Sequence, residues 1–231
     1  MNPSDAAECS DVLSILQILH RKDPKRIVVV IPFLDQSTQD RVEFHGDWET
    51  IAQVDTFGKR IGNYTTLTYD LHSEQTRWAF HDLRCKSLVL KLWKRYTRSY
   101  PDAVPVFPDD GAAKRFGRLL DIQNPVTFRK KRDDNDKTKR LIATDDEIEK
   151  GREYVIIDDL VRSGGTMRAV ATYLYEHGAS AVDALFAHAP YERTTARNLS
   201  IFRNISTSDS CPRSVPREHI DIRIADEFKS F

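Results

Sequence analysis

The chain has 231 residues, 40% hydrophobic and 30% charged, a size and composition that suit one large or two small α/β domains with a substantial core. Lysine and arginine balance aspartate and glutamate at 35 each, so no whole-molecule field draws the protein to nucleic acid or to an anionic membrane. The cysteines lack metal-ligand spacing, no apolar run reaches membrane-spanning length and no secretory leader is evident, so we expect a cytoplasmic protein.

Helical and strand patterns alternate along the chain, as the connections of a doubly wound parallel sheet require. In chain order, the first half predicts a helix around residues 12–19, a strand at 26–33, a helix at 48–61, a strand at 67–71 and a helix at 86–100. The second half predicts a strand at 104–107, a helix at 112–120, strands at 126–128 and 154–157, a helix at 167–177, a strand at 181–187 and, after residue 217, a strand and a short helix. We therefore expect two related α/β units, residues 1–98 and 99–231.

The strand at 154–157 leads into the most informative stretch of the chain. Its residues are β-branched or aromatic, which is typical of a strand buried on both faces, and ligands of α/β proteins lie at the carboxyl ends of such strands. Asp158 and Asp159 follow, where two carboxylates can accept hydrogen bonds from the neighbouring hydroxyls of a furanose. The next helix then begins in a turn whose N–H groups and hydroxyls suit a phosphate, namely Ser163, Gly164, Gly165 and Thr166. This order of parts predicts a site for a pentose 5-phosphate.

The alternative is that the acid pair is a solvated strand end and the Ser-Gly-Gly-Thr segment a turn with a helix cap. Neither the GxxxxGK motif of a P-loop nor the GxGxxG of a dinucleotide site is present, so neither of those nucleotide-binding loops competes.

This stretch resembles the phosphoribosyl pyrophosphate loop that type I phosphoribosyltransferases share with ribose-phosphate diphosphokinases. Further segments occur in the order found in the diphosphokinases: Ile31 to Leu34 with Gln39-Asp40-Arg41, Tyr69 to Gln75, Pro108 to Phe116, and Lys130-Lys131-Arg132. The Pro-Asp-Asp-Gly-Ala segment and the loop itself look most like the divergent, plant-type branch. The resemblance covers residues 11–210 and implies two phosphoribosyltransferase-like units that transfer the diphosphoryl group of ATP to ribose 5-phosphate.

The resemblance also implies roles for individual residues. The acid pair and the Ser163–Thr166 turn would bind ribose 5-phosphate, and the motif Gln39, Asp40 and Arg41 would bind ATP. His72 and Asp109 would hold Mg²⁺. Lys130 and Arg132 would stabilise the transferring group from the root of a mobile loop, with Lys131 in place of Lys130 if the register is shifted by one. The Ser206–Ser210 segment resembles one that lies near the sugar phosphate.

Each of these residues also has an ordinary structural interpretation. Taken alone, His72 is a hydrogen-bonded loop residue, and Asp109 with the Asp-Gly that follows it is a tight turn before a helix. The charged run at 128–140 is then a solvated loop.

The start of the chain departs from the resembling family. Full-length diphosphokinases begin some tens of residues earlier, with a first strand and a hairpin that grips the adenine of a neighbouring subunit's ATP, and residues 1–8 do not replace them. We therefore expect an exposed sheet edge, and self-association or pairing with a longer homologue. Two other functions stay open: a catalytically silent ribose-phosphate-binding regulatory subunit, and a phosphoribosyltransferase that displaces pyrophosphate with a base.

Overall fold

The computed structural model describes residues 6–34, 47–132, 140–190, 194–211 and 216–227. The chain divides into two compact units, the first made of Met1–Ser87 with Ser210–Pro212 and the second of Leu88–Asp209 with Arg213–Phe231. Each unit contains a parallel sheet covered by helices, which confirms the predicted α/β class. Among the described residues no helix combines the length and the apolar character needed to span a membrane.

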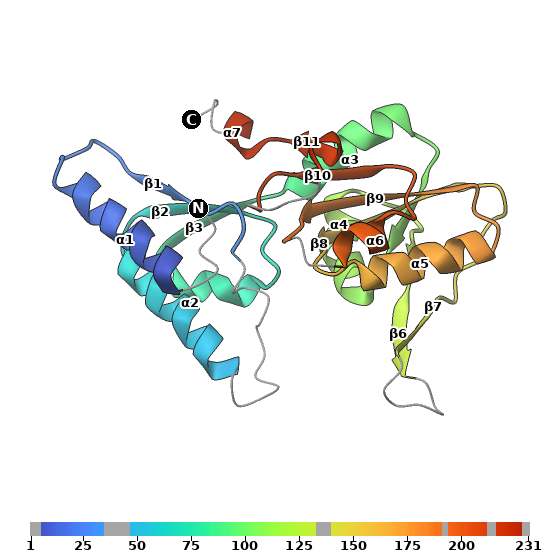
Figure 1. The fold of residues 1–231 in the computed structure, drawn as a ribbon, viewed down its shortest axis with the longest axis horizontal. Coiled ribbons are helices and arrows are strands. Elements are labelled where there is room, and N and C mark those ends of the chain that lie inside the picture. The colour runs from blue at the N-terminus through green and yellow to red at the C-terminus, as the bar shows by residue number, and fades with distance from the viewer. Residues whose placement is uncertain (1–5, 35–46, 133–139, 191–193, 212–215, 228–231) are drawn as a thin grey trace. The chain divides into compact units, whose positions relative to one another are not determined.

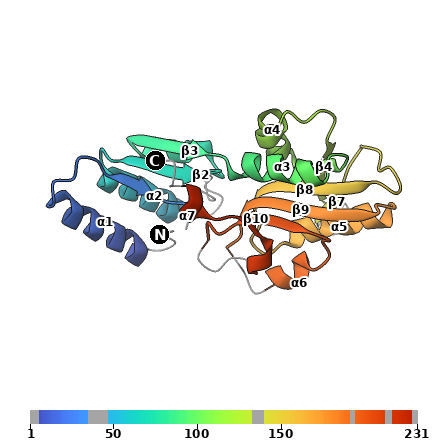
Figure 2. The same cartoon turned by 90° about the horizontal axis from the view of Figure 1, so that it is seen from above.

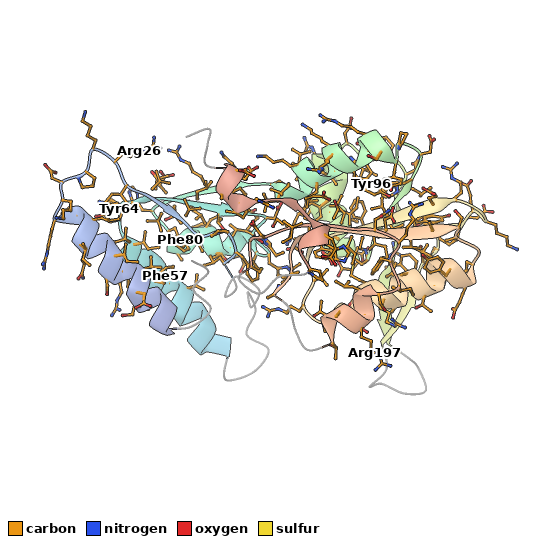
Figure 3. The ribbon with its side chains drawn as sticks, turned by 45° about the horizontal axis from the view of Figure 1, so that its top comes forward. Arg26, Phe57, Tyr64, Phe80, Tyr96 and Arg197 are labelled. Carbon is orange, nitrogen blue, oxygen red and sulfur yellow. The ribbon has the colours of Figure 1, made fainter. Side chains whose placement is uncertain are left out.

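The first unit is a three-stranded parallel sheet with two long helices. Its elements are α1 (Ala6–His20), β1 (Val28–Val30), α2 (Asp47–Ile61), β2 (Thr65–Tyr69), the 3-10 helix η2 (Glu74–Ala79) and β3 (Asp82–Lys86). The strand order is β1-β2-β3, and α1 and α2 lie together along one face (Figure 1). Val12 and Leu16 of α1 join Phe57 of α2 in the core of this unit. The rings of Phe57 and Phe80 meet edge to face with centroids 6.3 Å apart, which ties α2 to the end of η2 (Figure 3).

The second unit is a six-stranded, wholly parallel sheet with the order β11-β10-β9-β8-β4-β5. Its elements are α3 (Leu88–Ser99), β4 (Val104–Phe107), α4 (Asp110–Leu119), β5 (Val126–Thr127), β6 (Arg129–Arg132), β7 (Arg140–Ala143), β8 (Glu153–Leu160), α5 (Gly165–Glu176), β9 (Ala181–His188), α6 (Thr195–Leu199), β10 (Ile205–Ser208), η3 (Arg217–His219), β11 (Ile220–Ile222) and α7 (Ile224–Glu227). Helices α3 and α4 cover one face of this sheet, and α5 and α6 cover the other (Figure 2).

Strands β8 and β9 are buried in the middle of the sheet because each is covered on both faces. Every residue of β9 is buried, and four consecutive residues of β8, Tyr154 to Ile157, are buried too. This is the pattern expected of central strands in a parallel sheet. Ligand sites of such sheets lie at the carboxyl ends of the strands. The segments that follow β4 and β8 are therefore the candidates for a ligand site.

The charged run after β5 is in part an antiparallel ladder rather than the solvated loop that its composition suggests. Strand β6 pairs with β7 from Arg129 opposite Ala143 to Arg132 opposite Arg140. Figure 1 shows this two-stranded ladder extending away from the six-stranded sheet.

Helix α3 belongs to the second unit, whereas the predicted boundary near residue 99 assigned almost all of it to the first. The compact units divide between Ser87 and Leu88. The Tyr96 hydroxyl of α3 donates a 2.7 Å hydrogen bond to the buried carboxylate of Asp183 in β9. Because this helix packs on the second sheet, the natural division of the chain precedes it.

Candidate functional site

The predicted acid pair lies at the carboxyl end of a central strand. Strand β8 extends through Asp158 and Asp159 to Leu160, so the acids belong to the strand itself and do not follow it. Asp158 is opposite Phe186 in the register with β9, and the Val161 N–H donates a 2.9 Å hydrogen bond to the His188 carbonyl just beyond the strand. The backbone that carries the acids is therefore fixed by the sheet.

Asp159 is buried and paired with an arginine that the sequence had not singled out. Its exposed fraction is 3%, and its carboxylate accepts a hydrogen bond from the Nη1 group of Arg115 in α4. A buried carboxylate needs such a partner, because loss of hydration is costly for an uncompensated charge. Arg115 lies six residues after Asp109 within one of the recognised motifs, and that position was its sequence signal.

Asp158 has a different environment from its neighbour. It is only partly exposed, and its Oδ1 atom accepts a 2.9 Å hydrogen bond from the Asp159 N–H. Burial raises the pKa of the Asp158 carboxyl well above its usual range, and the negative charges of Asp159 and Asp109 add to that rise. Three carboxyl groups from the ends of β8 and β4 thus lie close enough to influence one another.

The turn after β8 begins the next helix two residues earlier than predicted. Helix α5 starts at Gly165, with Gly164 as its N-cap residue in the left-handed conformation at φ 76°. The N-cap residue, a glycine, has no side chain to cap the helix, and the Gly165 N–H donates a 3.4 Å hydrogen bond to the Ser163 hydroxyl. The first N–H groups of a helix have no partner within the helix, and they form a positive end that suits an anion.

A short helix that the sequence did not predict, α6, holds this turn through side-chain hydrogen bonds to its backbone. The Thr195 hydroxyl of α6 donates a 2.5 Å hydrogen bond to the Arg162 carbonyl, and the Asn198 side-chain amide donates a 2.8 Å hydrogen bond to the Ser163 carbonyl. The segment 195–199 is a single polar turn without apolar periodicity, and the spacing of three between Thr195 and Asn198 was its one weak signal.

Asp109 follows β4 and is the N-cap residue of α4. One of its carboxylate oxygens therefore has the structural role of a residue in a turn before a helix. Its Oδ1 atom accepts a 3.0 Å hydrogen bond from the Ala112 N–H. Carboxylate oxygen is a ligand that Mg²⁺ prefers. In the described part of the chain, however, no group of three or more His, Cys, Asp or Glu residues gathers as a metal site.

The other predicted metal ligand, His72, is in the first unit and is described within it. It is exposed and follows β2, separated from it by Asp70 and Leu71, both of which are buried. Asp70 has an unusual backbone with φ 36°, and its N–H donates a 3.0 Å hydrogen bond to the Lys86 carbonyl of β3. His72 thus follows the carboxyl end of a parallel strand, as predicted. Its side chain is exposed to solvent.

The predicted ATP motif, Gln39, Asp40 and Arg41, lies outside the described residues. The predicted catalytic cations, Lys130 and Arg132, are on strand β6. The base of that ladder is held by groups that the sequence did not indicate: the Thr144 hydroxyl donates a 2.8 Å hydrogen bond to the Thr127 carbonyl, and Asp146 Oδ2 accepts a 2.7 Å hydrogen bond from the Thr127 N–H.

The Ser206–Ser210 segment is largely engaged inside the second sheet. The Ser208 hydroxyl donates a 2.6 Å hydrogen bond to the Ala187 carbonyl of β9. The Thr207 hydroxyl is buried and has no hydrogen-bond partner among the described residues. A role for this segment near a sugar phosphate stays a prediction.

Comparisons with known proteins agree with this architecture. The family model of the phosphoribosyl transferase domain matches residues 89–210, which include β4, β8 and α5. A ribose-phosphate pyrophosphokinase of rice, number 4 of that plant, is 34% identical over 222 residues, which are 88% of this chain and 67% of the relative. Its counterpart of the same number in Arabidopsis thaliana is 30% identical over 92% of this chain and 67% of its own length. A chloroplastic ribose-phosphate pyrophosphokinase of Arabidopsis is 30% identical over 86% of this chain, which spans half of that protein.

A crystal structure supports the fold on its own. The phosphoribosylpyrophosphate synthetase of Mycobacterium smegmatis superimposes with a TM-score of 0.77 at 20% identity, over 99% of this chain and 78% of that protein. At this identity the likeness concerns the fold. Together with the family model and the plant relatives, it shows that this chain belongs to the ribose-phosphate pyrophosphokinase family.

Proposed function

We propose that the protein is a ribose-phosphate diphosphokinase, which transfers the diphosphoryl group of ATP to the anomeric hydroxyl of ribose 5-phosphate and releases AMP. One observation carries the proposal: an acid pair on β8 and the helix N-terminus of α5, whose N-cap residue is a glycine, adjoin the same strand end. A sugar with neighbouring hydroxyls and a terminal phosphate matches both parts. Membership of a family whose relatives are named for this activity supports the choice.

The substrate sugar would bind with its phosphate on the N–H groups and hydroxyls of the turn Ser163–Thr166. Its two ring hydroxyls would donate hydrogen bonds to Asp158 and Asp159. The ion pair with Arg115 helps here, because its positive charge compensates the buried Asp159 carboxylate, whose oxygens are hydrogen-bond acceptors. Bound this way, the sugar is held at two ends, which fixes the direction in which its anomeric hydroxyl points.

In the proposed reaction, the anomeric oxygen attacks the β-phosphorus of ATP. A new oxygen–phosphorus bond forms, the bond from the β-phosphorus to the oxygen it shares with the α-phosphorus breaks, and the anomeric proton is released. Lys130 and Arg132 would stabilise the charge that develops on the transferring phosphates, and Gln39, Asp40 and Arg41 would bind the nucleotide. Mg²⁺ would neutralise phosphate charge, with Asp109 and His72 as its proposed protein ligands. A loose transition state of this kind needs no strong general base.

The direct test is an activity assay on the full chain. Protein, ATP, ribose 5-phosphate and magnesium chloride are mixed and AMP is followed by chromatography, with omission of ribose 5-phosphate as the control. We expect AMP to form in proportion to phosphoribosyl pyrophosphate and only when the sugar phosphate is present. AMP without the sugar, or binding of ribose 5-phosphate without any turnover, would contradict the proposed reaction.

Self-association, or association with a longer homologue, and a cytoplasmic location are part of the same proposal. Sedimentation velocity on the purified chain tests the first of these, and a fluorescent fusion in cells tests the location. A monomer at all accessible concentrations that still turns over would remove assembly from the account.

A further inference from the structure

We propose that Thr195 and Asn198 of α6 are positioning residues that fix the peptide orientation of the turn after β8, so that its N–H groups face the phosphate. The inference rests on the proposed function, because it concerns how the same turn recognises its ligand. In this proposal, α6 decides whether N–H groups or carbonyl oxygens of the turn face the ligand.

The hydrogen bonds of the turn carry the argument. The Arg162 carbonyl accepts from the Thr195 hydroxyl at 2.5 Å, and the Ser163 carbonyl accepts from the Asn198 amide at 2.8 Å. The Gly164 carbonyl accepts from the Arg168 N–H at 2.9 Å inside the first turn of α5. Three successive carbonyls are therefore engaged by protein donors.

A planar trans peptide holds its carbonyl and its N–H on opposite sides. When α6 binds the carbonyls of Arg162 and Ser163, the N–H groups of Ser163 and Gly164 must point away from α6. The third engaged carbonyl belongs to the first turn of the helix, whose first N–H groups point toward its N-terminal end. The turn thus offers donors, and its acceptors are directed into the protein.

Helix α6 packs closely enough on the turn for this task. Thr195 is fully buried, and Leu199 belongs to the same core cluster as Val161 and Met167, which flank the turn. Gly164 makes the close approach possible, because a Cβ atom there would lie 3.2 Å from the Asn198 Cβ. The exposed Arg197 points outward from α6 (Figure 3), while its carbonyl accepts a 3.1 Å hydrogen bond from Arg168 of α5.

The orientation decides which ligands the turn accepts. If one of these peptides rotated, a carbonyl oxygen would replace an N–H at the open end, and it would repel a phosphate dianion. The nest of N–H groups that binds anions in other turns depends on the same orientation. Without the α6 donors, rotation costs less, so a fraction of molecules would present the wrong group.

Calorimetric titration of the full chain with ribose 5-phosphate tests this inference. Thr195→Val removes the hydroxyl at nearly constant volume, Asn198→Ala removes the amide, and Thr195→Ser keeps a hydroxyl donor. Thr172→Val is the matched control, because its hydroxyl also donates to a backbone carbonyl, that of Arg168, but on the outer part of α5. Far-UV circular dichroism and the thermal midpoint of each variant establish that it is folded.

We expect about five- to tenfold weaker binding of ribose 5-phosphate by Thr195→Val and by Asn198→Ala, the effect of one lost hydrogen bond. Thr195→Ser and Thr172→Val should bind like the wild type. In turnover, the KM for ribose 5-phosphate should rise while kcat and the KM for ATP stay unchanged, a split that a general loss of stability would not produce.

Equal binding by Thr195→Val, Asn198→Ala and the wild type would overturn the inference and leave the proposed function intact. So would binding by Thr195→Ser that is as weak as that of Thr195→Val, because packing and not the hydroxyl would then be responsible. Failure of the wild type itself to bind ribose 5-phosphate would overturn the proposed function and the inference with it.

Discussion

At the residue scale, the neighbouring Asp158 and Asp159 have different environments. Asp159 is buried against Arg115. Asp158 is partly exposed as a residue, but burial of its carboxyl group and the nearby carboxylates raise the pKa of that group. The sequence showed only that two acids follow an apolar run. Which one is paired depends on α4, an element some forty residues earlier that reaches the strand end only in the folded sheet.

Substitution of Arg115 tests this difference in environment. Arg115→Met should lower the free energy of unfolding by about 3–5 kcal/mol, because it leaves the buried Asp159 carboxylate without its partner. It should also weaken ribose 5-phosphate binding. Arg118→Met on the same helix is exposed and serves as the matched control. Urea unfolding and calorimetry check both effects, and similar behaviour of the two variants would show that the ion pair matters little.

Gly164 is the second residue whose local conformation can be tested. Gly164→Ala meets both a left-handed backbone, at φ 76°, and a Cβ contact of 3.2 Å with Asn198. Gly151→Ala meets the backbone strain alone, at φ 78° with no atom within 4 Å. We expect each to lose about 1–2 kcal/mol of stability from the backbone. Only Gly164→Ala should also lose ribose 5-phosphate affinity, and retention of full affinity would contradict the close packing of α6 on the turn.

At the element scale, a network of polar groups around the buried Asp183 joins α3, β8, β9 and the segment before β10. Arg203 donates to Asp183 through Nε at 3.0 Å and Nη2 at 2.6 Å, and to both carboxylate oxygens of Glu153 at 2.5 and 3.0 Å. The Tyr96 hydroxyl also donates to Asp183, and burial beside that carboxylate raises the pKa of Tyr96. The network lies near the amino-terminal ends of β8 and β9. It therefore stabilises the end of the sheet opposite the proposed ligand site.

The Glu153 part of this network predicts a pH dependence. Hydrogen bonds from Arg203 lower the pKa of the Glu153 carboxyl. A lowered folded-state pKa stabilises the protein fully above the ordinary carboxyl pKa of about 4.3, and this contribution is lost as the pH falls through the folded value. The difference in unfolding free energy between wild type and Glu153→Gln should therefore be largest near neutral pH and shrink below about pH 4.

Urea unfolding at several pH values measures that difference. Glu176→Gln, at an exposed site of α5, is the control and should show no such trend. A difference for Glu153→Gln that stays constant down to acid pH would mean that its pKa is not shifted by the ion pair.

Strand β6 predicts how the two cations share their task. The proposed pair, positions 130 and 132, and the alternative position 131 are consecutive residues of this strand. We expect Lys130→Ala and Arg132→Ala each to reduce kcat by about 10²–10³-fold with little change in the KM for ribose 5-phosphate. Lys131→Ala is the matched control and should stay near wild type. A severe loss in Lys131→Ala with an active Lys130→Ala would move the catalytic role by one residue.

How far the elements could be predicted depended on apolar periodicity. The strand at 104–107 has the observed bounds, and the helices at 48–61 and 167–177 were placed within two residues, because their buried faces repeat with the right period. Strand β3 was not predicted because its sequence, Asp82 to Lys86, alternates charged with less polar residues at a sheet edge. Helix α6 is only five residues long, and the β6–β7 ladder adjoins a highly charged run, so neither shows a clear apolar period; tertiary hydrogen bonds tie α6 to the turn after β8.

At the scale of the whole molecule, the proposed sugar-phosphate site is formed by segments far apart in the sequence. The motif after β4, the acids of β8, the turn before α5 and the donors of α6 meet at one end of the six-stranded sheet. The sequence could indicate the proposed site because its strand, acids and turn are contiguous. It could not indicate the support of that site, because Arg115, Thr195 and Asn198 reach it only through the sheet.

The central claim is that this turn and acid pair bind a pentose 5-phosphate, and a crystal structure of the protein with ribose 5-phosphate tests it most directly. We expect the phosphate oxygens about 3 Å from the N–H groups of Ser163 to Thr166, with the ring hydroxyls on Asp158 and Asp159. A sugar phosphate bound elsewhere on the chain, with this turn occupied only by water, would contradict the account.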